Sequence, residues 1–253
     1  MSVSFVKSIS AASVALAALA APAFASDLTP PPEREFSWSV NAAITSDYVF
    51  RGITQTNNDP AVSVGADFAY GIIYAGFWAS NVDEAISPDN FEIDYYAGIK
   101  PVLGPATFDF GVLYYTYPGL DTVAGEPTTV EFKAAVSGEI LPKLSATAAF
   151  YYTPEALGDF GEYYVYEGTL AYALPKISVF DPTISGTIGT YEYDDDVQNV
   201  DYTYWNAGIT FGYDKFAFDF RYWDTSEDLD LGLGTGILSD ERFVFTAKLT
   251  YGP

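Results

Sequence analysis

The 253-residue sequence has no cysteine and no histidine, and its 11 lysine and arginine residues face 34 aspartates and glutamates. Without histidine, the chain cannot use the imidazole-based nucleophile systems or form histidine metal sites. Without cysteine, an exported chain must be stabilised by burial and closure rather than by disulfides. The formal net charge of −23 argues against nucleic acid as a partner, because nucleic-acid surfaces bind basic proteins.

The N-terminus has the pattern of a secretory signal peptide. Lys7 supplies a positive charge, residues 9–20 form a short apolar run, and Ala23-Phe24-Ala25 is a small-x-small cleavage site. The run is too short to span a membrane as a helix. We therefore expect three parts: a signal peptide (1–25), an extended periplasmic tail (26–35) and a β-barrel domain (36–253).

The stretch from Phe91 to Tyr117 shows the pattern that the rest of the chain repeats. Apolar residues such as Phe91, Ile93 and Tyr95 alternate with Glu92 and Asp94, and a proline- and glycine-rich turn follows. Side chains of a strand alternate between its two faces, so each strand has one apolar and one polar face. Each strand has about ten residues, which suits a tilted strand that crosses a bilayer.

The pattern predicts an all-β fold, an antiparallel transmembrane β-barrel of about 12 strands without helices. Two strands lie in 91–117, and the faces of the third and ninth strands stay unassigned. The other strands are predicted at 36–45, 61–70, 72–81, 130–139, 144–152, 163–174, 183–193, 202–213, 216–223 and 242–251. Tyr48, Phe50 and Gly52 extend the alternation of the first strand, which predicts that this strand continues into 46–52, past the membrane.

Short and long connections alternate along the chain, as in bacterial outer-membrane barrels with short periplasmic turns and long extracellular loops. The long connections hold 20 of the 34 acidic residues and a single base, Arg51. They are either solvated loops or a ring of negative charge at one mouth. Arg51 itself is either part of an ion pair or a fixed positive charge that faces acids across a constriction.

A soluble β-domain also alternates, so other features must favour the membrane. Tyrosines cluster at strand ends, as at Tyr151-Tyr152 and Tyr163-Tyr164, which is typical of the aromatic girdles at lipid headgroups. The polar faces contain acids in the middle of strands, such as Asp67 and Asp109. Such acids are costly in a dry core but are tolerated in a water-filled lumen. Together with the signal peptide, these features favour a membrane barrel.

The motif Ser46–Thr56 (SDYVFRGITQT) resembles the TorF family of porins, and residues 74–83, 92–98 and 109–119 fit the same family. The resemblance implies an outer-membrane β-barrel of a Gram-negative bacterium that acts as a channel. It carries over no specific ligand.

The leading hypothesis is a porin-like channel for small solutes or ions, with a lumen that side chains or an inturned loop partly fill. The excess of inward acids predicts a preference for cations. We expect outer-membrane lipid and the outer-membrane assembly machinery as partners, and no cofactor, metal or catalytic residue. The candidate pore-lining residues are Arg51, Asp67, Glu92, Asp94, Asp109, Glu131, Lys133, Glu167, Asp219, Arg221 and Lys248.

Other classes of function remain open. A non-conducting structural or adhesive barrel would show the same alternation. A hydrolase would have to use paired carboxylates such as Glu92 and Asp94. A calcium site at 194–196 is a further alternative. Calcium needs several oxygen ligands, and these three consecutive aspartates lack the spaced Asp/Gly pattern of a calcium-binding loop, so a solvated acidic loop is favoured.

Overall fold

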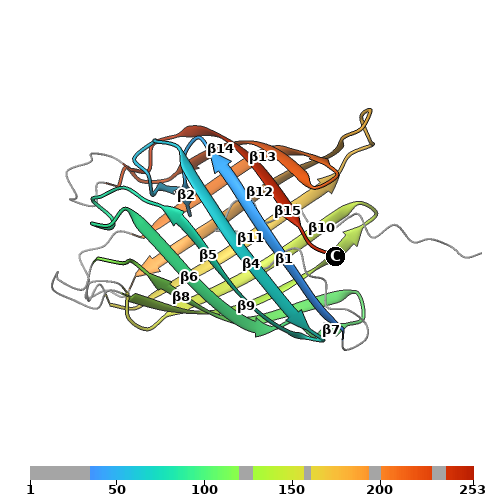
Figure 1. Cartoon of the computed structure of the whole chain (residues 1–253), viewed down its shortest axis with the longest axis horizontal. Helices are drawn as coiled ribbons and strands as arrows, with labels where there is room; N and C mark the ends of the chain where they lie inside the picture. The colour runs from blue at the N-terminus through green and yellow to red at the C-terminus, as the bar shows by residue number, and fades with distance from the viewer. Residues whose placement is uncertain (1–34, 120–127, 157–160, 194–200, 230–237) are drawn as a thin grey trace, which may run out of the picture.

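The computed structural model describes residues 35–119, 128–156, 161–193, 201–229 and 238–253. Twelve long antiparallel strands close into a barrel, and the described residues contain no helix (Figure 1). Closure comes from the pairing of β1 with β15 at the chain ends and of β6 with β8. The long strands are β1 (Phe36–Thr45), β4 (Ala61–Tyr70), β5 (Ile73–Asn81), β6 (Phe91–Ile99), β8 (Ala106–Thr116), β9 (Thr128–Leu141), β10 (Leu144–Thr153), β11 (Tyr163–Ala173), β12 (Asp181–Tyr193), β13 (Tyr202–Tyr213), β14 (Phe216–Thr225) and β15 (Arg242–Tyr251).

The sequence prediction of this fold is confirmed: all twelve strands lie within a few residues of their expected bounds. The short strand β7 (Val102–Leu103) adds a small pairing with β8 in the predicted turn. The structure also assigns the faces of the two ambiguous strands. Tyr74 and Trp78 of β5 and Tyr191 of β12 point inward, whereas Ile73 and Ile188 are exposed on the outside.

The alternation of the sequence becomes the two sides of the barrel wall. On β1, Phe36, Val40 and Ile44 are exposed outside, and Ser39 and Asn41 are buried inside. A large apolar outer surface around a polar interior is the arrangement of a barrel that sits in lipid and encloses a lumen.

The two ends of the barrel differ in their connections. We call one end the short-turn rim, with connections 71–72, 100–105, 142–143, 174–180 and 214–215, and the other the long-loop rim, with connections 46–60, 82–90, 117–127, 154–162, 194–201 and 226–241. Lys143 and Asp214 take the left-handed backbone conformation in their two-residue turns, as tight hairpins require. Among the described residues, no helix is long and apolar enough to cross a membrane.

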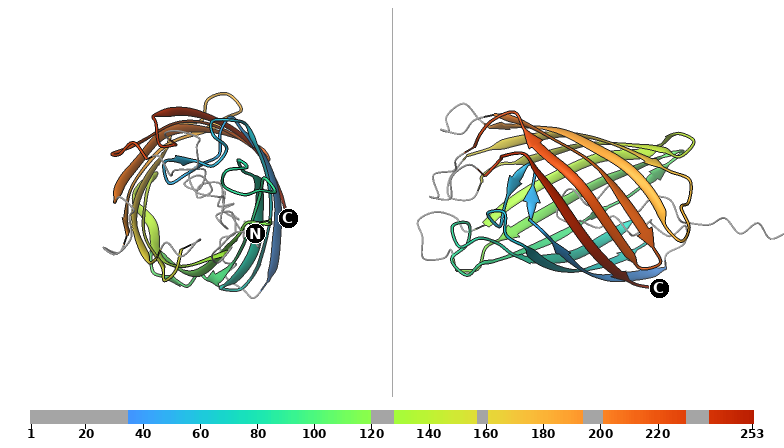
Figure 2. Two further views of the ribbon diagram at one scale, coloured as in Figure 1. Left: turned by 90° about the vertical axis from the view of Figure 1, so that its left-hand side faces the viewer. Right: turned by 90° about the horizontal axis from the view of Figure 1, so that it is seen from above.

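The alternation at Tyr48, Phe50 and Gly52 predicted that the first strand continues into 46–52, past the membrane, and this prediction is wrong. Strand β1 ends at Thr45, and the chain then turns into the barrel, where β2 (Val49–Phe50) and β3 (Ile53–Thr54) form a hairpin. Viewed from the long-loop rim, this hairpin lies inside the ring of strands (Figure 2). We call Val49–Thr54 the plug hairpin. It is the inturned loop that the sequence analysis allowed for.

Candidate functional site

The plug hairpin crosses the interior of the barrel. It leaves the end of β1 and reaches β9, with four strands between them one way around the barrel and six the other way. Its tip is a two-residue turn, Arg51-Gly52, and both residues have positive φ (48° and 85°). Such a turn favours Asn-Gly, so an arginine here costs about 1 kcal/mol or more of backbone strain. A side chain on Gly52 would clash with Tyr204 and Thr225, which shows how closely the tip approaches β13 and β14.

The arginine at the tip makes a bidentate ion pair. Its Nη1 and Nη2 atoms lie 2.7 and 2.9 Å from the two carboxylate oxygens of Glu131 on β9, and both side chains are buried. The guanidinium also lies 4.5 Å from the ring centre of Tyr151 and 4.7 Å from that of Phe50. Burial alone would lower the pKa of Arg51, but the carboxylate of Glu131 more than offsets this effect. The net pKa lies above its ordinary value, so the arginine stays charged.

Glu131 receives further hydrogen bonds from the wall. The hydroxyls of Tyr115 and Tyr163 donate to its two oxygens at 3.0 and 3.1 Å. The hydroxyl of Tyr202 donates to the backbone carbonyl of Arg51 at 3.2 Å. A buried ion pair is stable only when its remaining polar atoms are satisfied, and these tyrosines provide that satisfaction for the carboxylate. The structure thus shows the ion pair that was one of two interpretations of Arg51.

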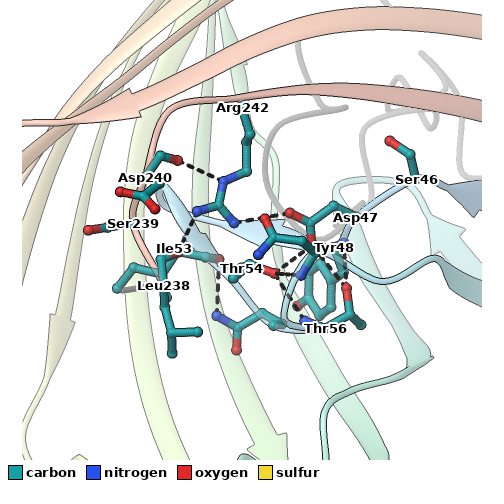
Figure 3. A network of polar contacts seen from close by, with 12 residues as sticks. Ser46, Asp47, Tyr48, Ile53, Thr54, Thr56, Leu238, Ser239, Asp240 and Arg242 are labelled. Carbon is teal, nitrogen blue, oxygen red and sulfur yellow. Dashed lines mark hydrogen bonds and ion pairs between the residues drawn. The ribbon is translucent and has the colours of Figure 1, made fainter. Parts of the chain in front are cut away.

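A second ion pair fixes the base of the plug hairpin (Figure 3). Asp47 accepts a bond from Nη1 of Arg242 at 3.1 Å and bonds from the hydroxyls of Thr54 and Thr56 at 2.5 and 2.9 Å. Arg242 in turn donates to the carbonyl of Leu238 at 2.8 Å, and the amide of Thr54 donates to the same carbonyl at 3.0 Å. The hairpin is therefore held at its base by β15 and at its tip by β9.

Tyrosines from the strand ends pack around the plug hairpin. Tyr151 and Tyr163 are buried inside the barrel, whereas their neighbours Tyr152 and Tyr164 stack on the outside with ring centres 5.2 Å apart. The girdle prediction is therefore wrong for the inward member of each pair and stays a prediction for the outward member. The inward members belong to two interior clusters that contact the hairpin; their larger aromatic residues are Tyr151, Tyr163, Tyr191, Tyr202, Tyr204 and Trp223 in one, and Tyr48, Tyr74, Trp78, Tyr96 and Tyr115 in the other.

The other candidate residues also lie on the inner face, where most of them are bound in local networks. Lys133 pairs with Asp109 at 2.8 Å. Arg221 pairs with Asp219 at 3.0 Å and also donates to Asn206 at 2.6 Å. In each pair the acid and the base come from the same strand or from neighbouring strands, and their charges neutralise each other.

Three further candidates accept hydrogen bonds or face the cavity described below. Asp67 accepts bonds from Ser39 and from the hydroxyl of Tyr96. Glu167 accepts a bond from the hydroxyl of Tyr204 at 2.8 Å. Lys248 lines the cavity beside the base of the plug hairpin.

Glu92 and Asp94 differ from the other acids. They share the inner face of β6 and are 2% and 0% exposed, and within the described residues neither has a base at ion-pair distance. Glu92 accepts one bond from Tyr117 at 2.9 Å, but its second oxygen and both oxygens of Asp94 have no partner in the described part of the chain. Burial, and then the charges of these two acids, raise the pKa of Tyr48 and of Tyr117, so both hydroxyls stay protonated.

The sequence analysis missed the residues that hold the base of the hairpin. Asp47 was counted only as a loop acid, and Arg242 only as the start of a strand. The signal for Arg242 was available, because it shares the inward alternation of Val244 and Lys248. The proposed calcium residues 194–196 lie outside the described residues, and the described part contains no group of three acids that could hold a metal ion.

A cavity of about 80 Å³ remains beside the hairpin. It lies between the segment 47–49 and the contiguous wall of β5, β4, β1, β15 and β14. Members of both aromatic clusters line it, Tyr48 and Trp78 from one and Trp223 from the other, so the cavity lies next to the plug hairpin where the two clusters meet.

Solved structures share this architecture. The KdgM porin superposes with a TM-score of 0.56 at 8% identity, over 84% of this chain and 98% of that chain. The NanC porin also gives a TM-score of 0.56, at 11% identity, over 84% of this chain and 98% of that one. At such low identity the likeness shows the fold alone.

The family was identified from the sequence. No curated protein matches the chain. A family model described as "Bacterial protein of unknown function (Gcw_chp)" matches residues 31–251. The narrower resemblance to the TorF family stays a prediction. The chain belongs to the Gcw_chp family, and it folds as a closed twelve-stranded barrel.

Proposed function

We propose that the protein is a porin-like channel of the outer membrane of a Gram-negative bacterium, and that it admits small solutes or ions with a preference for cations. The observation that carries the proposal is the closed barrel, which has an apolar outer face and a charged interior. The plug hairpin narrows this interior and leaves a cavity beside it. The fold that it shares with the KdgM and NanC porins and the TorF-like motif at 46–56 support the same class.

The preference for cations rests on two sets of charges. The long-loop rim presents exposed acids, among them Asp59, Glu84, Glu227 and Asp228, and the only base in its connections is Arg51, which Glu131 neutralises. Inside, Glu92 and Asp94 have no base at ion-pair distance in the described residues, so each adds an uncompensated negative charge whenever it is ionised. A low-dielectric wall focuses such a field and concentrates cations.

The orientation follows from the same comparison of rims. Short turns face the periplasm and long loops face outward in outer-membrane barrels. We therefore assign the long-loop rim, with its acids, to the cell exterior, and the surrounding outer face to membrane lipid. The outer-membrane assembly machinery is the expected partner during biogenesis.

A second candidate function is a structural or adhesive barrel that does not conduct. It is favoured by one observation, the dense packing of tyrosines around the plug hairpin. Conductance separates the two functions, because a permanently closed plug passes no ions.

The test is the reversal potential of the purified protein in a planar bilayer under a potassium chloride gradient. A cation preference that is clear at low salt should weaken as the Debye length falls from about 30 Å at 0.01 M to about 3 Å at 1 M. The Glu92→Gln/Asp94→Asn variant should lower the preference more than the Glu227→Gln/Asp228→Asn control on the solvated rim. An anion-selective current would contradict the proposal.

A further inference from the structure

The cavity beside the plug hairpin has a wall of mixed chemistry. Trp78 on β5, Trp223 on β14 and Tyr48 on the hairpin segment supply aromatic surface, while Asn41 and Lys248 supply hydrogen-bond donors. Its volume of about 80 Å³ holds roughly six water molecules, judged by the space that one buried water requires. A solute of this size has few heavy atoms.

Asn41 points to a ligand. Its side chain is buried, at 8% exposed, and it lines the cavity, yet its amide makes no hydrogen bond within the described residues. It lies against Gly65 of the neighbouring strand, where an added Cβ would come within 3.0 Å of Nδ2. The amide faces the cavity and has both a donor and an acceptor to offer, so it suits an occupant that both donates and accepts hydrogen bonds.

The charges around the cavity favour an uncharged occupant. The carboxylate of Asp47 is already paired with Arg242 and two threonine hydroxyls. The ammonium of Lys248 opposes a bound cation, and the acids of the long-loop rim oppose the approach of an anion. An uncharged molecule avoids both repulsions.

We propose that this cavity is a binding station for a small, uncharged, hydroxyl-rich solute, of the size of a three- or four-carbon polyol. Its carbon skeleton packs on the rings of Trp78 and Trp223, and its hydroxyls exchange hydrogen bonds with the amide of Asn41 and accept from Lys248. The inference rests on the proposed function, because it names the class of solute that the channel holds.

The experiment measures binding without flow. The intact protein in detergent micelles is titrated with erythritol while tryptophan fluorescence is recorded, since two of the four tryptophans line the cavity. We expect a saturable change that the Trp78→Phe variant reduces, and an affinity that Asn41→Leu lowers about tenfold, which is the loss of one or two hydrogen bonds. Trp38→Phe, on the outer face, is the matched control and should leave the saturable change in place.

Several results overturn the inference. A linear change that Asn41→Leu does not alter means that the cavity holds only water, and tighter binding of an anionic or cationic analogue than of erythritol means that the charge argument is wrong. If Asn41→Leu fails to give a folded barrel, Asn41→Ser replaces it, and an unchanged affinity of that variant also counts against the site. Saturable binding by a protein that carries no current supports the station and contradicts the channel, whereas current without saturable binding contradicts the station alone.

Discussion

The guanidinium of Arg51 and the carboxylate of Glu131 meet through two contacts of 2.7 and 2.9 Å although 80 residues separate them in the chain. This ion pair ties the segment that follows β1 to the far wall of the barrel. The strained backbone of Arg51 and the four hydrogen bonds to Glu131 are features of the plug hairpin, which they hold across the lumen. The width of any passage through the barrel therefore depends on where this hairpin is held.

Breaking the pair on one side should destabilise the protein strongly. Glu131→Gln leaves the buried guanidinium without a counter-charge, so we expect the free energy of unfolding to fall by about 3–5 kcal/mol. The double variant Arg51→Met/Glu131→Leu removes both charges and should lose less than the sum of the single changes. Urea unfolding from lipid vesicles, followed by tryptophan fluorescence, measures the free energy of unfolding of Glu131→Gln, of the double variant and of its two single changes, Arg51→Met and Glu131→Leu. Additive losses would show that the two residues do not interact.

The outer face should reject charge in proportion to depth. Phe110 lies in the middle of β8 and is 47% exposed on the outside, so Phe110→Arg should cost about 2–4 kcal/mol if lipid surrounds it. Phe36, at the end of β1 nearest the short-turn rim, is the depth control, and its arginine variant should cost about 1 kcal/mol or less. Equal losses at the two positions in vesicle unfolding would count against a membrane-spanning wall.

The two rims should be reachable from opposite sides of the outer membrane. The chain has no cysteine, so single cysteines at Glu84 or Glu227 report the long-loop rim, and those at Lys143 or Lys215 report the short turns. A membrane-impermeant maleimide added to intact cells should label the first two and spare the others. The reverse pattern would invert the proposed orientation.

Stability should decrease in alkali partly through Tyr117. Burial and the charges of Glu92 and Asp94 raise the pKa of this hydroxyl, so above pH 10 the unfolded chain loses a proton that the folded chain keeps. The free energy of unfolding should therefore fall above about pH 10, by up to about 1.4 kcal/mol per pH unit from this group. Tyr117→Phe should show a shallower fall when urea unfolding is measured at pH 9 and pH 11, and an identical slope would refute this role of Tyr117.

The barrel was predictable because its information is local. Period-two alternation within each strand, as in Phe91 to Ile99, gives both the strand and the side of it that faces out of the barrel. The plug hairpin was not predictable in this way. Tyr48, Phe50 and Gly52 continue the same alternation, and a strand that leaves the barrel and one that folds back into it have the same local pattern.

The contacts of the site escaped prediction for a related reason. Alternation places Glu131 and Arg242 inside but does not say that each one meets a residue of the segment that follows β1. The inward tyrosines, such as Tyr163, alternate in the same way as girdle residues, and only the hairpin that they contact reveals their role. The sequence held one hint, the single base Arg51 among the acids of the long connections.

The most direct test of the account is the unitary conductance of single channels in a planar bilayer, compared between the wild-type protein and a variant in which residues 49–54 are replaced by Gly-Ser. The Asn57→Gly/Asn58→Gly variant, altered in the exposed part of the same connection, serves as control. We predict that the wild-type protein and the control conduct equally and that the variant without the plug hairpin conducts more. No current in any of the three, or one conductance shared by all three, would contradict a channel constricted by this hairpin.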